Sequence, residues 1–313
     1  MPLSDAQLRY YDSNVLRLPK DARAAYNKQV DNLVAELGRS LRDKKGIRIT
    51  QVVKAGSFAK HTILRKTAAD RVDVDVVVYI SGRDVDRETL SSLSDAVHEL
   101  LVELYPSKSV EDFEIQRTAA TVTFVGTGLS VDVVPVIEDP RRPGYGWQFD
   151  IKDGSRRQTC APCQIKFVRV RKDRDPDFRT LVRMAKRWRT QAELVHLKSF
   201  AVELIMAHLL DTQGSGSSIE QRFRNFLLYI AQSELKEQIR FPENGVVTKF
   251  TDPVVIVDPV CDSNNVASRL TESERQEIVG AALEAWECAN YASASNNADV
   301  WKEVFGPRFR IEE

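Results

Sequence analysis

The sequence lacks a charge excess of either sign. Lysine and arginine together number 45, as do aspartate and glutamate, so the formal net charge of the 313 residues is zero. A protein dedicated to binding duplex nucleic acid usually carries a basic excess, which is missing here. We therefore expect no duplex DNA partner. A small anionic substrate remains compatible with this composition, because it needs only a local group of basic side chains.

Cysteines are few, and long apolar runs are absent. Four cysteines do not make a disulfide framework in a chain of this length. Two of them lie in Cys160-Ala-Pro-Cys163, a spacing found in zinc sites, but further ligands are not in view, so metal binding by this pair stays open. No segment approaches the roughly 18 apolar residues of a membrane helix, and the N-terminus has no apolar signal stretch. We expect a monomeric cytoplasmic protein without membrane contact.

Hydrophobic periodicity divides the chain into an α/β half and a helical half. Strand-like runs alternate with amphipathic helices up to about residue 150, whereas the residues after 176 show mainly helical spacing. The segment 141–176 is rich in proline, glycine and charge, and we interpret it as the connection. The predicted domains are 1–150, a mixed-sheet α/β core with N-terminal helices, and 151–313, a helical lobe.

Two aspartates interrupt a valine-rich strand predicted over residues 72–80. Side chains alternate along a strand, so Asp73 and Asp75 point to one face, about 6–7 Å apart. Such a pair is costly without a cation, because each carboxylate raises the pKa of the other. An exposed edge strand would explain the charges more simply, but the flanking valines indicate a buried strand. Asp132 is a third aspartate flanked by valines, in a later strand.

Three carboxylates and a Gly-Ser turn together favour phosphoryl or nucleotidyl transfer. We predict Asp73, Asp75 and Asp132 as catalytic residues and as ligands of two Mg²⁺ ions, with Mn²⁺ as the alternative, about 3.5–4 Å apart. Gly56 and Ser57 precede the strand and would offer backbone N–H groups and a hydroxyl to a triphosphate.

These motifs resemble the nucleotidyltransferase superfamily of DNA polymerase beta type. Within it, the chain resembles the cGAS/DncV-like nucleotidyltransferases (CD-NTases) of bacterial anti-phage signalling, known as CBASS, over most of its length. The resemblance implies that Lys186 and Ser199 contact phosphate and that Phe200 stacks on a base. Each residue has a structural alternative: an exposed helix face for Lys186, a helix cap for Ser199 and core packing for Phe200. Asp70 is placed in the loop before the strand and is not predicted as a ligand.

The resemblance also implies a two-lobed fold with a central cleft and a specific reaction. Ribonucleoside triphosphates, ATP among them, would be joined into a cyclic di- or trinucleotide messenger that a separate effector protein reads. An alternative function on the same fold is a linear oligonucleotide synthase or another nucleotidyltransferase. An alternative that is not an enzyme is a catalytically silent nucleotide-binding module. Base identity, linkage, ring size and activating signal are not determined by the sequence.

Overall fold

The computed structural model describes residues 2–65, 71–82 and 87–311. The chain forms two compact units, of which one is the continuous segment Leu18–Lys166 and the other combines Met1–Arg17 with Phe167–Glu313. This division differs from the predicted boundary between residues 150 and 151 at two places. The N-terminal segment groups with the helical unit, and residues 151–166 group with the sheet.

The N-terminal segment belongs to the helical unit because its buried side chains pack there. Asp12 is fully buried, and its carboxylate accepts hydrogen bonds from Arg183 and Thr180. The buried ring of Tyr11 packs against Phe305. A buried carboxylate is costly unless it is paired and hydrogen-bonded, so this ion pair holds the segment in place. Helical periodicity predicts the local structure of the segment, but it does not show which core receives it.

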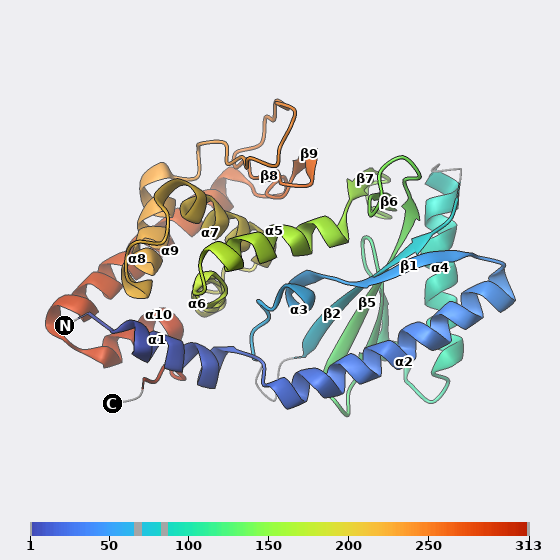
Figure 1. Ribbon diagram of the computed structural model, residues 1–313, viewed down its shortest axis with the longest axis horizontal. Helices are drawn as coiled ribbons and strands as arrows, with labels where there is room; N and C mark the ends of the chain where they lie inside the picture. The colour runs from blue at the N-terminus through green and yellow to red at the C-terminus, as the bar shows by residue number, and fades with distance from the viewer. Residues whose placement is uncertain (1, 66–70, 83–86, 312–313) are drawn as a thin grey trace. The chain divides into compact units, whose positions relative to one another are not determined.

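The unit Leu18–Lys166 is built on a mixed sheet. Among its described residues the sheet has seven strands: five follow the order β1-β2-β5-β4-β3, β6 pairs with β5, and β7 pairs with β6 (Figure 1). Strands β2 and β5 are parallel, and the other pairs are antiparallel. The strands are β1 Ile49–Lys54, β2 Val72–Ile80, β3 Phe113–Ile115, β4 Ala120–Phe124, β5 Leu129–Glu138, β6 Gly146–Phe149 and β7 Arg156–Thr159.

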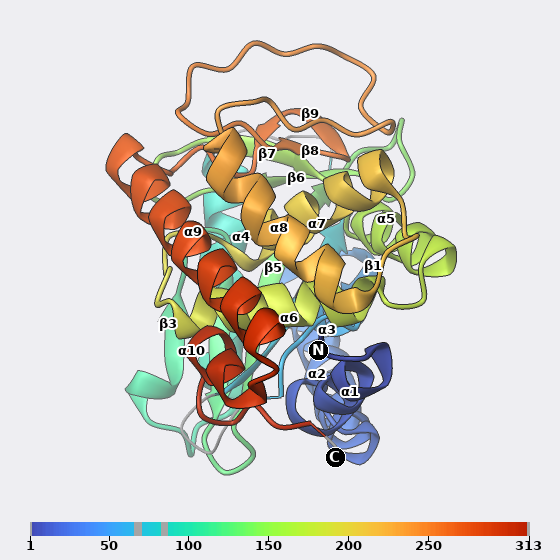
Figure 2. The ribbon, with the colours of Figure 1, turned by 90° about the vertical axis from the view of Figure 1, so that its left-hand side faces the viewer.

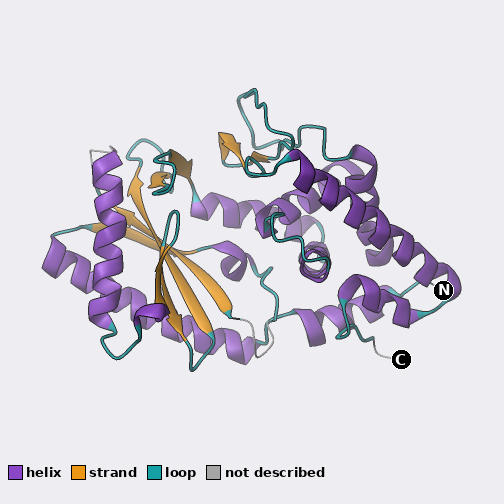
Figure 3. Ribbon diagram, turned by 180° about the vertical axis from the view of Figure 1, so that it is seen from behind, coloured by secondary structure: helices purple, strands orange, loops and turns teal. Residues whose placement is uncertain are grey.

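Two helices cover one face of this sheet. Helices α2 (Lys20–Lys45) and α4 (Arg87–Leu104) lie against the strands (Figure 3). Their leucines and valines pack against alternate strand residues in one apolar core. The even-numbered side chains of β2 belong to this core, so the odd-numbered side chains point to the opposite face. The predicted strand over residues 72–80 is thereby confirmed. Two short helices complete the unit: α3 Gly56–Lys60 and the 3-10 helix Val110–Asp112.

The segment 141–176, which we interpreted from the sequence as the connection, contains the boundary between the two units at residues 166 and 167. It contains β6, β7 and the helix α5 (Ala161–Arg174). The β6–β7 hairpin extends the sheet from β5, where Ile137 lies opposite Trp147. Helix α5 places few apolar side chains in the core, so its sequence shows little periodicity. The hairpin in this region is held by strand pairing, which is difficult to predict from amino-acid composition.

The second unit is mainly helical (Figure 2). Helices α8 and α9 lie side by side, and a capping box of Thr271 and Glu274 begins α9. No helix within the described residues is long and apolar enough to cross a bilayer. The elements are α1 Asp5–Tyr11, the π-helix Asp12–Leu16, α6 Phe178–Gln191, α7 Ser199–Gln213, α8 Ile219–Ser233, β8 Val257–Asp258, β9 Cys261–Asn265, α9 Glu272–Ser295, the 3-10 helix Ala298–Val300 and α10 Trp301–Phe305.

Candidate active site

The three predicted carboxylates lie on one face of the sheet. On β2 the flanking valines are buried, whereas Asp73 is exposed and Asp75 is half-buried. Strands β2 and β5 are parallel neighbours, and their register places Asp75 beside Asp132 and Asp73 beside Ser130. Neighbouring strands are about 4.8 Å apart, so the backbones that carry Asp75 and Asp132 are as close as a sheet allows.

The environment of Asp132 disfavours its negative charge. Its pKa is raised to about 6, chiefly by burial and also by the negative charges of Asp75 and Asp73. A hydrogen bond of 2.6 Å from Thr121 Oγ1 to Asp132 Oδ1 opposes this rise. A cation at this face would relieve the same unfavourable charge. The electrostatics of the three aspartates therefore fit a cation site.

Thr121 is a site residue that we did not predict from the sequence. It lies on β4 directly opposite Asp132 and is 4 % exposed, so its hydroxyl is a buried donor that orients the carboxylate. The sequence contains a signal that could have found it, because Gly126-Thr127-Gly128 between two strand-like runs is typical of a hairpin turn. Once Phe124 is placed opposite Leu129, counting outward along both strands pairs Thr121 with Asp132.

Gly56 lies directly against Asp75. Its φ is +58°, and a Cβ atom added at this position would lie 1.6 Å from Asp75 Oδ2. The approach is held by a hydrogen bond of 2.7 Å from the N–H of Ala55 to the carbonyl oxygen of Asp75. Gly56 and Ser57 are the first two residues of helix α3, where we expected a turn and a loop. Only glycine combines this backbone conformation with this contact.

The three residues inferred from the family resemblance lie in the helical unit. Lys186, in α6, is 5 % exposed, and its Nζ lies 3.8 Å from Oε2 of Glu203 in α7, so it does not belong to an exposed helix face. Ser199 is the first residue of α7, and the N-cap is Lys198, so Ser199 is not the cap. Phe200 is half-buried. Nucleotide binding by these residues stays a prediction.

The described side chains do not form a closed metal cage. Across residues 2–65, 71–82 and 87–311, no three or more His, Cys, Asp or Glu side chains are arranged as a ready metal site. Asp70 lies outside the described residues. Cys160 and Cys163 are joined in a disulfide, so their sulfur atoms bind each other. Mg²⁺ does not need such a cage, because it is usually held by one or two carboxylates and by substrate phosphates.

The first half of the sequence matches the model of a known protein family. Residues 1–166 match the family model "Second Messenger Oligonucleotide or Dinucleotide Synthetase domain". The chain is 63% identical over 313 residues to the CBASS oligonucleotide cyclase CdnC of Escherichia coli (strain KTE188), covering 100% of this chain and 99% of that protein. The chain belongs to this synthetase family. The synthetase is also 33% identical over 307 residues to the cyclic AMP-AMP-AMP synthase of E. coli (strain MS 115-1), with 94% of each chain covered.

Solved structures agree with this assignment. Two structures of E. coli MS115-1 CdnC, one with ATP and one in a complex with HORMA-deltaN, each match the synthetase with a TM-score of 0.83 and 31% identity. They cover 98% of the synthetase, and 99% and 98% of those chains. Vibrio cholerae DncV with the linear intermediate 5′ pppA(3′,5′)pG has a TM-score of 0.72 at 13% identity, covers 98% of each chain and shows the fold alone. The predicted nucleotidyltransferase fold and the predicted enzyme class, an oligonucleotide cyclase, are confirmed.

Proposed function

We propose that the synthetase joins ribonucleoside triphosphates, ATP among them, into a cyclic di- or trinucleotide at the face formed by Asp73, Asp75 and Asp132. The observation that carries this proposal is the parallel register of β2 and β5, which gathers the three carboxylates on one face. ATP as a substrate is supported by two relatives: CdnC, whose structure contains ATP, and the cyclic AMP-AMP-AMP synthase.

The donor set of this face fits Mg²⁺, with Mn²⁺ as the alternative. Carboxylate oxygens are the hard ligands that both ions accept, and the raised pKa of Asp132 reflects a negative charge that lacks compensation. Two bound ions would neutralise charge on the attacking hydroxyl and on the leaving pyrophosphate. Asp73 and Asp75 would hold the donor triphosphate through them. Asp132 would be a ligand of the ion that binds the acceptor hydroxyl.

The remaining site residues orient these groups and the substrate. Gly56 has no side chain to displace Asp75, and the first N–H groups of α3 would bind the triphosphate together with the hydroxyl of Ser57. In the helical unit, Lys186 would contact phosphate, and one such charge-assisted contact contributes roughly 1.5–3 kcal/mol. Ser199 would be a second phosphate contact, and Phe200 would stack on a base.

Product analysis of the full chain tests this function. The protein is incubated with labelled ribonucleoside triphosphates and Mg²⁺ or Mn²⁺, and the products are treated with phosphatase. Cyclic products resist this treatment, whereas linear products lose their terminal phosphates. Linear products alone would establish a linear synthase instead. Complete absence of product would favour a silent nucleotide-binding module.

A pair of variants assigns the activity to the proposed face. The double variant Asp73→Asn and Asp75→Asn keeps the shape of both side chains but removes their charge, so it should make no product. Asp43 is an aspartate of α2 whose side chain is 69% exposed, so Asp43→Asn removes one charge away from the site and should retain full activity. Normal synthesis by the double variant would remove these aspartates from the mechanism.

We also infer a HORMA-domain protein as a partner. The support is the complex of CdnC with HORMA-deltaN, because that CdnC is 31% identical to the synthetase over 98% of its length. A separate effector protein would then read the cyclic product. Light scattering after gel filtration tests the partner: a complex with the summed mass of both proteins supports it, and two separate species contradict it.

A further inference from the structure

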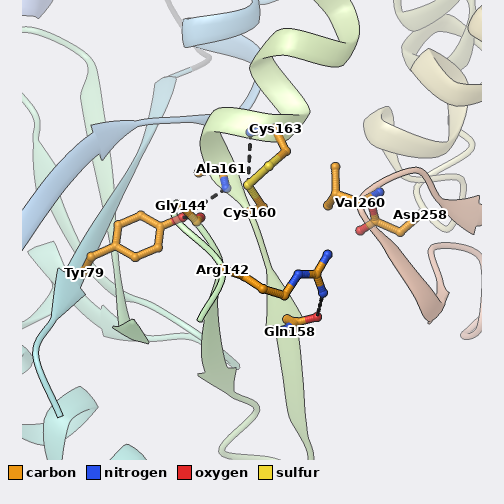
Figure 4. The surroundings of a disulfide bond; sticks show 9 residues. All are labelled: Tyr79, Arg142, Gly144, Gln158, Cys160, Ala161, Cys163, Asp258 and Val260. Carbon is orange, nitrogen blue, oxygen red and sulfur yellow. Dashed lines mark hydrogen bonds between the residues drawn. A yellow bond between two sulfur atoms is a disulfide. The ribbon is translucent and has the colours of Figure 1, made fainter. Parts of the chain in front are cut away.

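The disulfide between Cys160 and Cys163 lies at the start of helix α5 (Figure 4). Cys160 is fully buried and directly precedes the helix, and its carbonyl oxygen accepts the N–H of Gln164. Its Sγ accepts the N–H of Cys163 at 3.2 Å, which is the hydrogen bond that a capping side chain accepts at a helix N-terminus. Cys163 is half-buried, so it is the less buried cysteine of the pair.

This helix start is hydrogen-bonded to the sheet face that carries the carboxylates. The hydroxyl of Tyr79 accepts the N–H of Ala161 at 3.1 Å and donates to the carbonyl oxygen of Gly144 at 2.8 Å (Figure 4). Tyr79 follows Asp75 by four residues on β2, so both side chains point to one face, about 13 Å apart along the strand. Val77, between them, packs with Tyr79 and Ala161 in one small apolar cluster.

We propose that Cys160 and Cys163 form a thiol–disulfide exchange site whose reactant is a dithiol, and that its redox state sets the stability of the first turn of α5. The exchange and its effect on the helix are independent of the assignment of the nucleotide site, and only the expected effect on synthesis rests on the proposed function. The pair has the two features that exchange requires. The less buried cysteine, Cys163, would receive the attack, and Cys160 would leave as a thiolate that a helix N-terminal N–H stabilises.

Reduction proceeds in two balanced steps. A thiolate of the dithiol attacks Cys163 Sγ, a mixed disulfide forms, and the bond to Cys160 breaks, leaving a Cys160 thiolate. The second thiolate of the reagent then attacks the reagent sulfur of the mixed disulfide, so that Cys163 leaves as a thiolate and the reagent becomes a disulfide. Two electrons pass to the protein. The two protons of the dithiol end on the two cysteines, and oxidation by the reagent's disulfide is the reverse.

Alkylation trapping tests the exchange on the full chain. The protein is equilibrated with dithiothreitol at graded ratios of its reduced and oxidised forms, alkylated with N-ethylmaleimide under denaturing conditions and weighed by mass spectrometry. We expect one transition that adds two alkyl groups at once. Cys163→Ser should abolish it. Cys288→Ser should retain it, because Cys288 is unbonded and burial raises the pKa of its thiol.

Two trapping outcomes would overturn the proposal. In the first, both thiols are alkylated at every ratio, so that no disulfide forms. In the second, the isolated protein holds one zinc ion that is released when Cys163 is replaced.

Hydrogen exchange tests the structural consequence. Reduction should speed amide exchange in residues 161–166 and lower the thermal midpoint by a few degrees, because the covalent link across the first turn is lost. Oligonucleotide synthesis should be slower in the reduced protein, because this turn is bonded to the catalytic sheet face through Tyr79. Identical exchange and identical synthesis in both redox states would refute a role for the pair in this turn.

Discussion

A Gly56→Ala substitution would push a methyl group into the carboxylate of Asp75. The change has two separable effects. The first is conformational, because φ at this position is +58° and a left-handed conformation costs an L-residue roughly 1–2 kcal/mol. The second is steric, because the new Cβ would lie 1.6 Å from Asp75 Oδ2, whereas ordinary contacts begin at 3.4 Å.

The steric effect determines the expected loss of activity. The carboxylate of Asp75 has to move by about 2 Å, and a misplacement of about 1 Å can already reduce a catalytic rate by ~100-fold. A loss of at least ~100-fold corresponds to about 2.7 kcal/mol of transition-state stabilisation. Gly46→Ala is the matched control, because φ at Gly46 is +65° and no atom lies within 4 Å of the added Cβ. Both variants carry the conformational cost, and only one displaces Asp75.

The assay measures synthesis and stability on the same preparation of each variant. Initial rates of phosphatase-resistant product are measured with Mg²⁺, and urea unfolding gives the stability of each protein. We expect similar losses of stability and a large loss of synthesis only for Gly56→Ala. If Gly56→Ala makes product as fast as Gly46→Ala, the position of Asp75 is not critical and the proposed site is wrong.

Four further predictions address single residues. Asp132→Asn should cut single-turnover synthesis by several orders of magnitude and leave the affinity for a non-hydrolysable triphosphate intact; equal losses in both would indicate a structural role. Folding raises the pKa of Asp132 from 3.8 to about 6. The free energy of unfolding of the metal-free protein therefore falls as the pH rises from 3.8 to about 6, and the full loss is present above pH 6. Asp132→Asn should therefore stabilise the metal-free protein to urea above about pH 6 and have no such effect below about pH 4, and a pH-independent difference would contradict this. Thr121→Val removes the hydrogen bond that lowers this pKa, so the acid limb of the rate–pH profile should move to higher pH and Thr121→Ser should restore it; an unmoved limb in Thr121→Val would exclude this role. Lys186→Ala removes the cation beside buried Glu203 and should lower stability by about 3 kcal/mol. The double variant Lys186→Ala and Glu203→Gln should recover stability but not the affinity for triphosphate. If calorimetry shows that Lys186→Ala binds triphosphate with unchanged affinity, Lys186 lies outside the site.

Much of the sheet that carries the three aspartates could be predicted from the sequence. Alternation of valine and aspartate is a local property with a period of two, so it places Asp73 and Asp75 on one face without knowledge of any partner strand. The strand over residues 72–80 was predicted for the same reason, because its alternation depends on neighbours within a few residues. The family resemblance supplied the fold and the enzyme class.

Contacts between distant segments could not be read in this way. The proximity of Gly56 to Asp75 depends on a hydrogen bond between Ala55 and β2, and the pairing of Lys186 with Glu203 depends on how two helices face each other. The Thr121–Asp132 hydrogen bond was predictable only after the hairpin register was counted.

Local periodicity is sufficient to predict the amphipathic helices, the alternating strand and the side chains that this strand presents on one face. The tertiary structure decided which strands are neighbours, which core receives the N-terminal segment, and that 141–176 is a hairpin and a helix. The physical reason is the range of the interactions. Periodicity reflects burial of each element against some apolar surface, whereas strand register, ion pairs and a disulfide depend on one particular partner far along the chain.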